Sequence, residues 1–170
     1  ALISKEQFGQ FTLDTFPSIN SRTLATVPAP AYAGLNAKTV KVAQSSQVGA
    51  WSAYQISNIS AASFAGFTSN NVYVGPSGTS GLRPGSLALI SKEQFGQFTL
   101  KTVACSIRRA FRTLPAPAHD GLNEKTVKVA QSSQVGAWSA SQISNISAAS
   151  FAGFTSNNLY MRPSGYTGLR

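Results

Sequence analysis

Few side chains in this sequence could take part in catalysis. The chain has one histidine, His119, one cysteine, Cys105, and five acidic residues. Cys105, His119 and the adjacent Asp120 could supply a nucleophile and its base. The histidine, however, ends the Pro-Ala stretch "TLPAPAHDG", where an isolated histidine is most often a solvated loop residue. We therefore predict no catalytic residue and no enzymatic activity.

Metal and cofactor sites are also not predicted. A single cysteine excludes an intrachain disulfide and an all-cysteine metal site. Glu6 and Glu93 each stand alone, so they do not form the carboxylate pair that glycosidases use. The glycine-rich segments 77–81 and 163–168 lack the Gly-Lys-Ser/Thr sequence of a phosphate-binding loop. We expect no metal ion and no cofactor.

The charge of the chain indicates its partners. Only 11% of the residues are charged, against about 25% in average proteins, yet the net charge is +9. Residues 1–87 carry +3 and residues 88–170 carry +6, with much of the excess in "SIRRAFR" at 106–112. Arg108, Arg109 and Arg112 around Phe111 could bind phosphates and stack on a base, or meet an acidic protein surface. No 18-residue apolar run is present, so no membrane partner is expected.

Aromatic residues suggest a different binding function. Trp51 and Trp138, with Tyr54, Tyr73 and Tyr160, could form a platform on which sugars stack. Both tryptophans, however, lie in the sequence "VGAWSA", between small apolar residues. That surrounding favours a position in the core over a sugar site.

The chain is a tandem duplication. Residues 1–83 align with residues 88–170 at a constant offset of 87, and 63 of the 83 pairs are identical. Thirteen of the 20 differences fall between residues 14 and 33 and their counterparts 101–120. Drift in a loop, or contact with different neighbours, would explain that clustering equally well. We predict two repeats, 1–83 and 88–170, joined by a turn or linker at 84–87.

The local sequence pattern favours strands. "TVKVAQ", "SAYQISN" and "NNVYVG" are short segments between turn residues, typical of strands of a half-buried sheet. "LALISKEQFGQFTL" is interpreted as one or two strands, although a helical turn at "SKEQFGQ" is the rival. The two Pro-Ala stretches are expected to be extended linkers. The predicted fold is all-β, with each repeat an antiparallel β-sandwich or small barrel.

The segment "SNNVYVGPSGTSGLRPGSLALI" at 69–90 resembles small β-sandwich domains of tailed-phage virion proteins, such as capsid decoration, head-fibre and tail-associated modules. The matching residues are Asn71–Gly75, Ser77, Gly78, Leu82, Pro84 and Gly85. The resemblance implies a structural role in a virion.

The resemblance also suggests a second division of the chain. If Pro84 and Gly85 form a turn inside a domain, residues 38–100 make one sandwich. Residues 125–170 then lack a strand, which residues 1–13 could supply. The N-terminal strand would complete the second unit either within the chain or by strand donation from a neighbouring chain.

The sequence thus predicts a non-enzymatic structural protein of a large homo- or hetero-oligomeric assembly, located in a virion. The alternative is a secreted or extracellular tandem-repeat β-lectin that uses Trp51 and Trp138. The third possibility is a nucleic-acid-binding module that uses Arg108–Arg112. The candidate assembly contacts are Phe8, Phe11, Arg22, Phe95, Phe98, Arg108, Arg109, Phe111 and Arg112.

Overall fold

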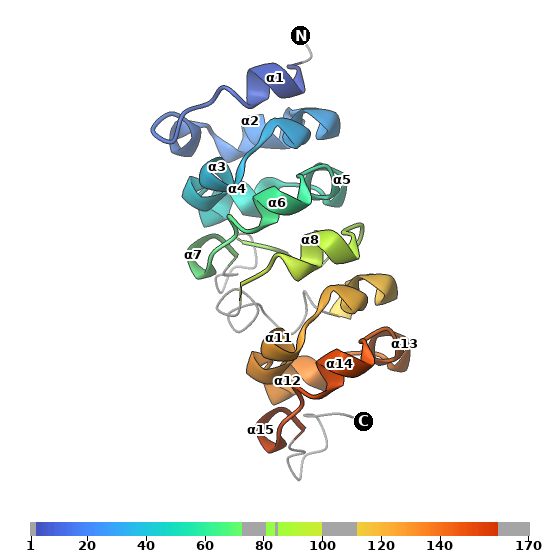
Figure 1. Ribbon diagram of the computed structural model, residues 1–170. Coiled ribbons are helices and arrows are strands. Elements are labelled where there is room, and N and C mark those ends of the chain that lie inside the picture. The colour runs from blue at the N-terminus through green and yellow to red at the C-terminus, as the bar shows by residue number, and fades with distance from the viewer. Residues whose placement is uncertain (1–2, 73–80, 84, 100–111, 160–170) are drawn as a thin grey trace.

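The fold is helical. The computed structural model describes residues 3–72, 81–83, 85–99 and 112–159, and within these ranges the chain forms short α and 3-10 helices and no strand (Figure 1). The predicted all-β fold, with its antiparallel sandwiches or small barrels, is therefore wrong.

The unit of this fold is eight residues long, and we call it an octad. Octads follow one another at 4–11, 12–19 and so on to 60–67, and again at 91–98 and from 115 to 154. In each octad, position 1 precedes the helix, and positions 5 and 8 turn apolar side chains inward. Position 5 is occupied by Phe8, Phe16, Leu24, Tyr32, Val40, Val48, Ile56 and Phe64 in the first repeat, all of them buried.

A reciprocal capping pair marks the start of several of the described helices. In the octad 52–59, the Ser52 hydroxyl accepts a hydrogen bond from the Gln55 N–H, and Gln55 Oε1 accepts one from the Ser52 N–H. This reciprocal pair satisfies donors that a helix start leaves unpaired. The backbone is extended where an octad ends, as at Trp51, and where the next begins, as at Ser52. Each octad is therefore about one helical turn followed by a corner.

The helices of the first repeat run in chain order along the stack. They are α1 (Lys5–Phe8), η1 (Phe16–Ser18), α2 (Ser21–Thr26), η2 (Ala29–Gly34), α3 (Ala37–Val42), α4 (Ser45–Ala50), α5 (Ala53–Ser57), α6 (Ala61–Phe64) and α7 (Ser69–Val72). Those of the second repeat are α8 (Lys92–Gly96), η3 (Ala116–Gly121), α11 (Glu124–Val129), α12 (Ser132–Val135), α13 (Ala140–Ser144), α14 (Ala148–Phe151) and α15 (Ser156–Leu159).

The corners wind the chain into a solenoid. Helices three octads apart pack on one another, as α3 does with α6, and α11 with α14. Side-chain hydrogen bonds join residues 28 and 31 positions apart, so groups that meet between successive turns lie three to four octads apart along the sequence. The turns stack along one axis, with α1 and α15 at opposite ends (Figure 1).

The predicted strands are helices for a local reason. "TVKVAQ" alternates apolar and polar residues, but Asn36 caps the Thr39 N–H and starts α3 over the same residues. "SAYQISN" forms α5, and "SKEQFGQ" forms α8, which confirms the helical rival for that segment. The Pro-Ala stretches are not extended linkers but the 3-10 helices η2 and η3. In "NNVYVG", residues 73–75 lie outside the described residues.

The predicted N-terminal strand is likewise wrong. Residues 5–8 form α1, which packs against η2 of the same repeat. Since α1 and α15 lie at opposite ends of the stack, residues 3–13 do not complete the second repeat within one chain (Figure 1).

The hydrophobic core continues across the boundary between the repeats. Helix α8 packs on α6, and Phe98 contacts both Phe64 and Phe67, with ring centroids 5.5 and 5.8 Å apart. These contacts cross the linker predicted at residues 84–87. The division of the chain into two domains at that linker stays a prediction.

Candidate functional site

His119, the residue most suited to chemistry, is buried in the core. It lies in η3 between the rings of Phe95 and Trp138, at centroid distances of 5.7 and 5.5 Å. It occupies octad position 5, where the first repeat has Tyr32, whose hydroxyl donates to the Leu24 carbonyl at 2.9 Å. His119 is therefore a core residue, and the expectation of a solvated loop histidine is wrong.

The surroundings of His119 keep it neutral. Burial lowers its pKa to about 4, since the charged ring would lose its hydration. Nδ1 lies 3.3 Å from the Pro115 carbonyl, so the neutral ring carries its proton on Nδ1 and donates it there. Nε2 is then an acceptor, and it is buried with no hydrogen-bond partner in the described part of the chain.

We expect this histidine to make the protein sensitive to acid. Between pH 6.5 and 4 the unfolded chain binds a proton at His119 and the folded chain does not. The free energy of unfolding therefore falls as the pH falls through that window, by at most about 3 kcal/mol. Denaturant unfolding followed by circular dichroism at pH 7.5, 5.5 and 4 measures the loss.

His119→Phe is the matched variant, because phenylalanine fits the same aromatic stack and cannot titrate. The carboxylates titrate in both proteins, so the difference between their pH profiles isolates His119. Parallel profiles for the two proteins would show that His119 is not the acid-sensitive group.

Asp120, which was expected near His119, does not form a site with it. Asp120 is exposed and its carboxylate accepts a hydrogen bond from Lys92 Nζ at 2.9 Å, which raises the pKa of Lys92. Cys105 lies outside the described residues. Within the described ranges, no group of three or more His, Cys, Asp and Glu side chains could hold a metal ion, and no helix is long and apolar enough to cross a membrane.

The two tryptophans are core residues, which confirms the interpretation that the sequence favoured. Trp51 is fully buried and packs edge-on against Tyr32 and Phe67, and Trp138 is almost as buried. Both occupy octad position 8, and neither Nε1 has a hydrogen-bond partner among the described residues. Neither ring is presented at the surface for a sugar, although Tyr54 is 70% exposed.

The predicted assembly contacts fall into three groups. Phe8, Phe95 and Phe98 are buried inside the solenoid, and Phe11 is partly buried at its N-terminal end. Arg22 and Arg112 are exposed. Arg108, Arg109 and Phe111 lie outside the described residues.

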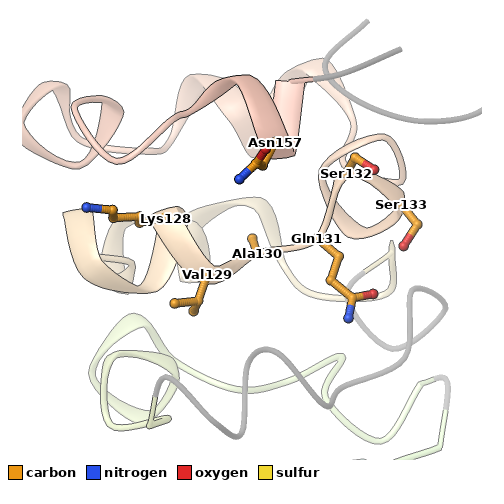
Figure 2. A pocket seen from close by; sticks show the side chains of 7 residues that line it. All are labelled: Lys128, Val129, Ala130, Gln131, Ser132, Ser133 and Asn157. Atoms are coloured by element: carbon orange, nitrogen blue, oxygen red, sulfur yellow. The ribbon is translucent and has the colours of Figure 1, made fainter. Parts of the chain in front are cut away.

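A surface pocket of about 600 Å³ lies beside the C-terminal end of α11. Figure 2 shows its lining, with Asn157 approaching from α15 and the other side chains along the segment from α11 to α12. Lys128 and Gln131 extend toward opposite ends of the pocket, so its polar groups do not converge on one ligand (Figure 2).

The residues that sequence reasoning missed stand at octad position 4. Their side chains are polar and yet buried, and most of them donate hydrogen bonds to carbonyls of the preceding turn. Gln55 Nε2 donates to the Leu24 and Val27 carbonyls at 3.1 and 2.7 Å. A plot of each repeat in rows of eight residues would have shown them, because they fall in one column directly before the apolar residues of position 5. They are Thr39, Gln47, Gln55, Ser63 and Asn71 in the first repeat, and Thr126, Gln134, Gln142, Ser150 and Asn158 in the second.

The same ladder links the two repeats. Gln94, in the first octad of the second repeat, donates to the Ser57 carbonyl at 3.0 Å and to the Ile59 carbonyl at 2.6 Å. Together with the stack of Phe98 on Phe64 and Phe67, these bonds form what we call the repeat junction. It is the best-defined recognition surface in the described part of the chain, because it already joins two copies of the repeat.

In the described part of the second repeat, counterparts of the residues that this junction covers are partly exposed. Phe64 is fully buried under α8, whereas its counterpart Phe151 in α14 is 40% exposed. Leu159 is 37% exposed, whereas its counterpart Val72 is buried. We call Phe151, Phe154 and Leu159 the C-terminal end face.

In the described part of the chain, the repeat junction is a surface on which one repeat stacks on the other. A comparison with models of protein families, with curated proteins and with solved structures finds no match to this chain.

Proposed function

We propose that this chain is a non-enzymatic structural protein, a solenoid that serves as a rigid component of a larger protein assembly. The repeat junction is the observation that carries the proposal. It joins the duplicated halves through one apolar core and a ladder of hydrogen bonds, so the duplication lengthens the stack rather than adding a second globule.

The surface of the stack agrees with this role. Octad positions that face outward are mostly Ser, Ala, Asn, Gln and Thr, and the protein carries few charges. The two ion pairs of the described residues are exposed, and exposed pairs contribute little stability. Rigidity comes instead from buried contacts between turns, which suits a spacer or scaffold.

The rival functions have less support. The lectin alternative needs exposed tryptophan rings, and both rings are buried. The nucleic-acid alternative depends on Arg108 and Arg109, which lie outside the described residues. A virion location rested on a resemblance that implied strands, so the helical fold removes that support and the location stays a prediction.

Two measurements test the structural role. Small-angle scattering at low protein concentration should give a radius of gyration clearly above the value of about 15 Å expected for a compact chain of this length. Tryptophan fluorescence should be unchanged by added mono- and oligosaccharides, because Trp51 and Trp138 are shielded. A saturable fluorescence change would favour the lectin. Binding to heparin that is lost when Arg108, Arg109 and Arg112 become alanine would favour the nucleic-acid module.

A further inference from the structure

We propose that the C-terminal end face binds the N-terminal octad of a second copy of this chain, so that the protein assembles head to tail. The inference rests on the proposed structural role and names its partner. Its starting point is that both surfaces of such a contact already meet inside one chain, at the repeat junction.

The two surfaces are repeated letter for letter. Residues 60–67, which form the side of the junction that belongs to the first repeat, read "SAASFAGF". Residues 147–154 in the second repeat have the same sequence. Residues 91–98, which form the side of the junction that belongs to the second repeat, read "SKEQFGQF". Residues 4–11 have the same sequence. A second copy therefore carries on its N-terminal octad the same side chains that cover α6 inside the chain.

The burial of these residues differs between the repeat junction and the outer octads. Phe98 and Gln94 are buried in the junction. Their counterparts are not: Phe11 is partly buried and Gln7 is exposed. In the C-terminal end face, Phe151 is 40% exposed, whereas its counterpart Phe64 at the junction is fully buried. Stacking one copy on another would bury both sets in the environment that they have at the junction.

The polar contacts of the junction fix the expected geometry. Gln94 Nε2 donates to the Ser57 and Ile59 carbonyls. By the offset of 87, Gln7 of a second copy would donate to the carbonyls of Ser144 and Ile146. Because the two ends are unlike, the contact is heterologous and does not close, so it generates linear chains rather than a symmetric dimer.

Two variants block the two ends separately. Gln7→Glu keeps the capping pair with Ser4, since glutamate serves equally well at that position, but its carboxylate cannot donate to a carbonyl. Phe151→Asp puts a charge into the C-terminal end face at a position that is already 40% exposed. Circular dichroism and thermal unfolding check that both variants stay folded. Tyr54→Asp, at an exposed position away from both ends, is the control.

Sedimentation equilibrium of the full chain gives the test. The wild type and Tyr54→Asp should show an average mass that rises with concentration above 17.8 kDa. Gln7→Glu alone and Phe151→Asp alone should each remain at the mass of a monomer. An equimolar mixture of the two should form a dimer and nothing larger, because it contains one open N-terminal end and one open C-terminal end.

Three results would overturn the inference: a monomeric wild type at every concentration, association of either variant alone, or a mixture that stays monomeric. Each of them leaves the structural role itself open to the scattering and fluorescence measurements, so the two proposals can fail separately.

Discussion

Gln55→Ala is expected to lower the free energy of unfolding by about 3 kcal/mol. The side chain is buried, and its amide donates to the Leu24 and Val27 carbonyls of the preceding turn while its oxygen caps Ser52. Alanine leaves the Val27 carbonyl without its donor, at about 1–3 kcal/mol for an unsatisfied buried group, and it also removes the cap on Ser52, at about 1 kcal/mol. The Leu24 carbonyl keeps the bond from the Tyr32 hydroxyl. Chemical denaturation followed by circular dichroism measures the loss.

Gln7→Ala is the matched control for this change. Gln7 holds the same octad position and caps Ser4 in the same way, but it is exposed in the first described helix. Its replacement should cost only the cap, about 1 kcal/mol. The difference between the two variants measures the bonds between turns, and equal losses would mean that the ladder adds nothing beyond capping.

Gly66→Ala is expected to disrupt the contact between α3 and α6. A Cβ atom on Gly66 would collide with the carbonyl oxygen and carbon of Ala37, and backbone atoms cannot swing aside as a flexible side chain can. The turns must therefore separate, and we expect a loss of about 3 kcal/mol or more. Thermal unfolding should show a lower and broader transition, because contact between turns holds the stack together.

Gly96→Ala provides the comparison for Gly66→Ala. Its Cβ would lie 3.0 Å from the Gly121 carbonyl oxygen, which a shift of a few tenths of an ångström relieves. We expect a loss below about 1 kcal/mol. If Gly66→Ala were as mild as Gly96→Ala, the close approach of α3 and α6 would be wrong. The same close approach recurs between Gly153 and Glu124 in the second repeat, so Gly153→Ala should repeat the larger effect.

Strands were predicted because the common tests for periodicity do not detect this pattern. An octad contains about one turn of helix, so apolar residues at positions 5 and 8 never extend into a long stripe with a period of 3.6 residues. Val40 and Val42 in α3 thus look like one face of a strand, although Val40 is buried and Val42 is only partly buried. The capping residue Asn36 was the local evidence for a helix.

The 87-residue repeat hid the shorter one. Its length is ten octads plus seven residues. The octad register therefore shifts by one residue, and this shift lies between Val72 and Leu87. Because the offset is not a multiple of eight, aligning the two copies does not display the octads. Within each copy, however, the apolar residues stay in one register, so the spacing of eight was available from the sequence.

The sequence by itself determined the duplication and the core position of both tryptophans. Only the tertiary structure decided that Gln55 and its equivalents are buried, that His119 is a core residue and that the repeats form one stack. The physical reason is that these properties depend on contacts between residues 28 to 37 positions apart. A local pattern specifies where each helix begins and ends, but the winding of the solenoid decides which carbonyl lies above each amide.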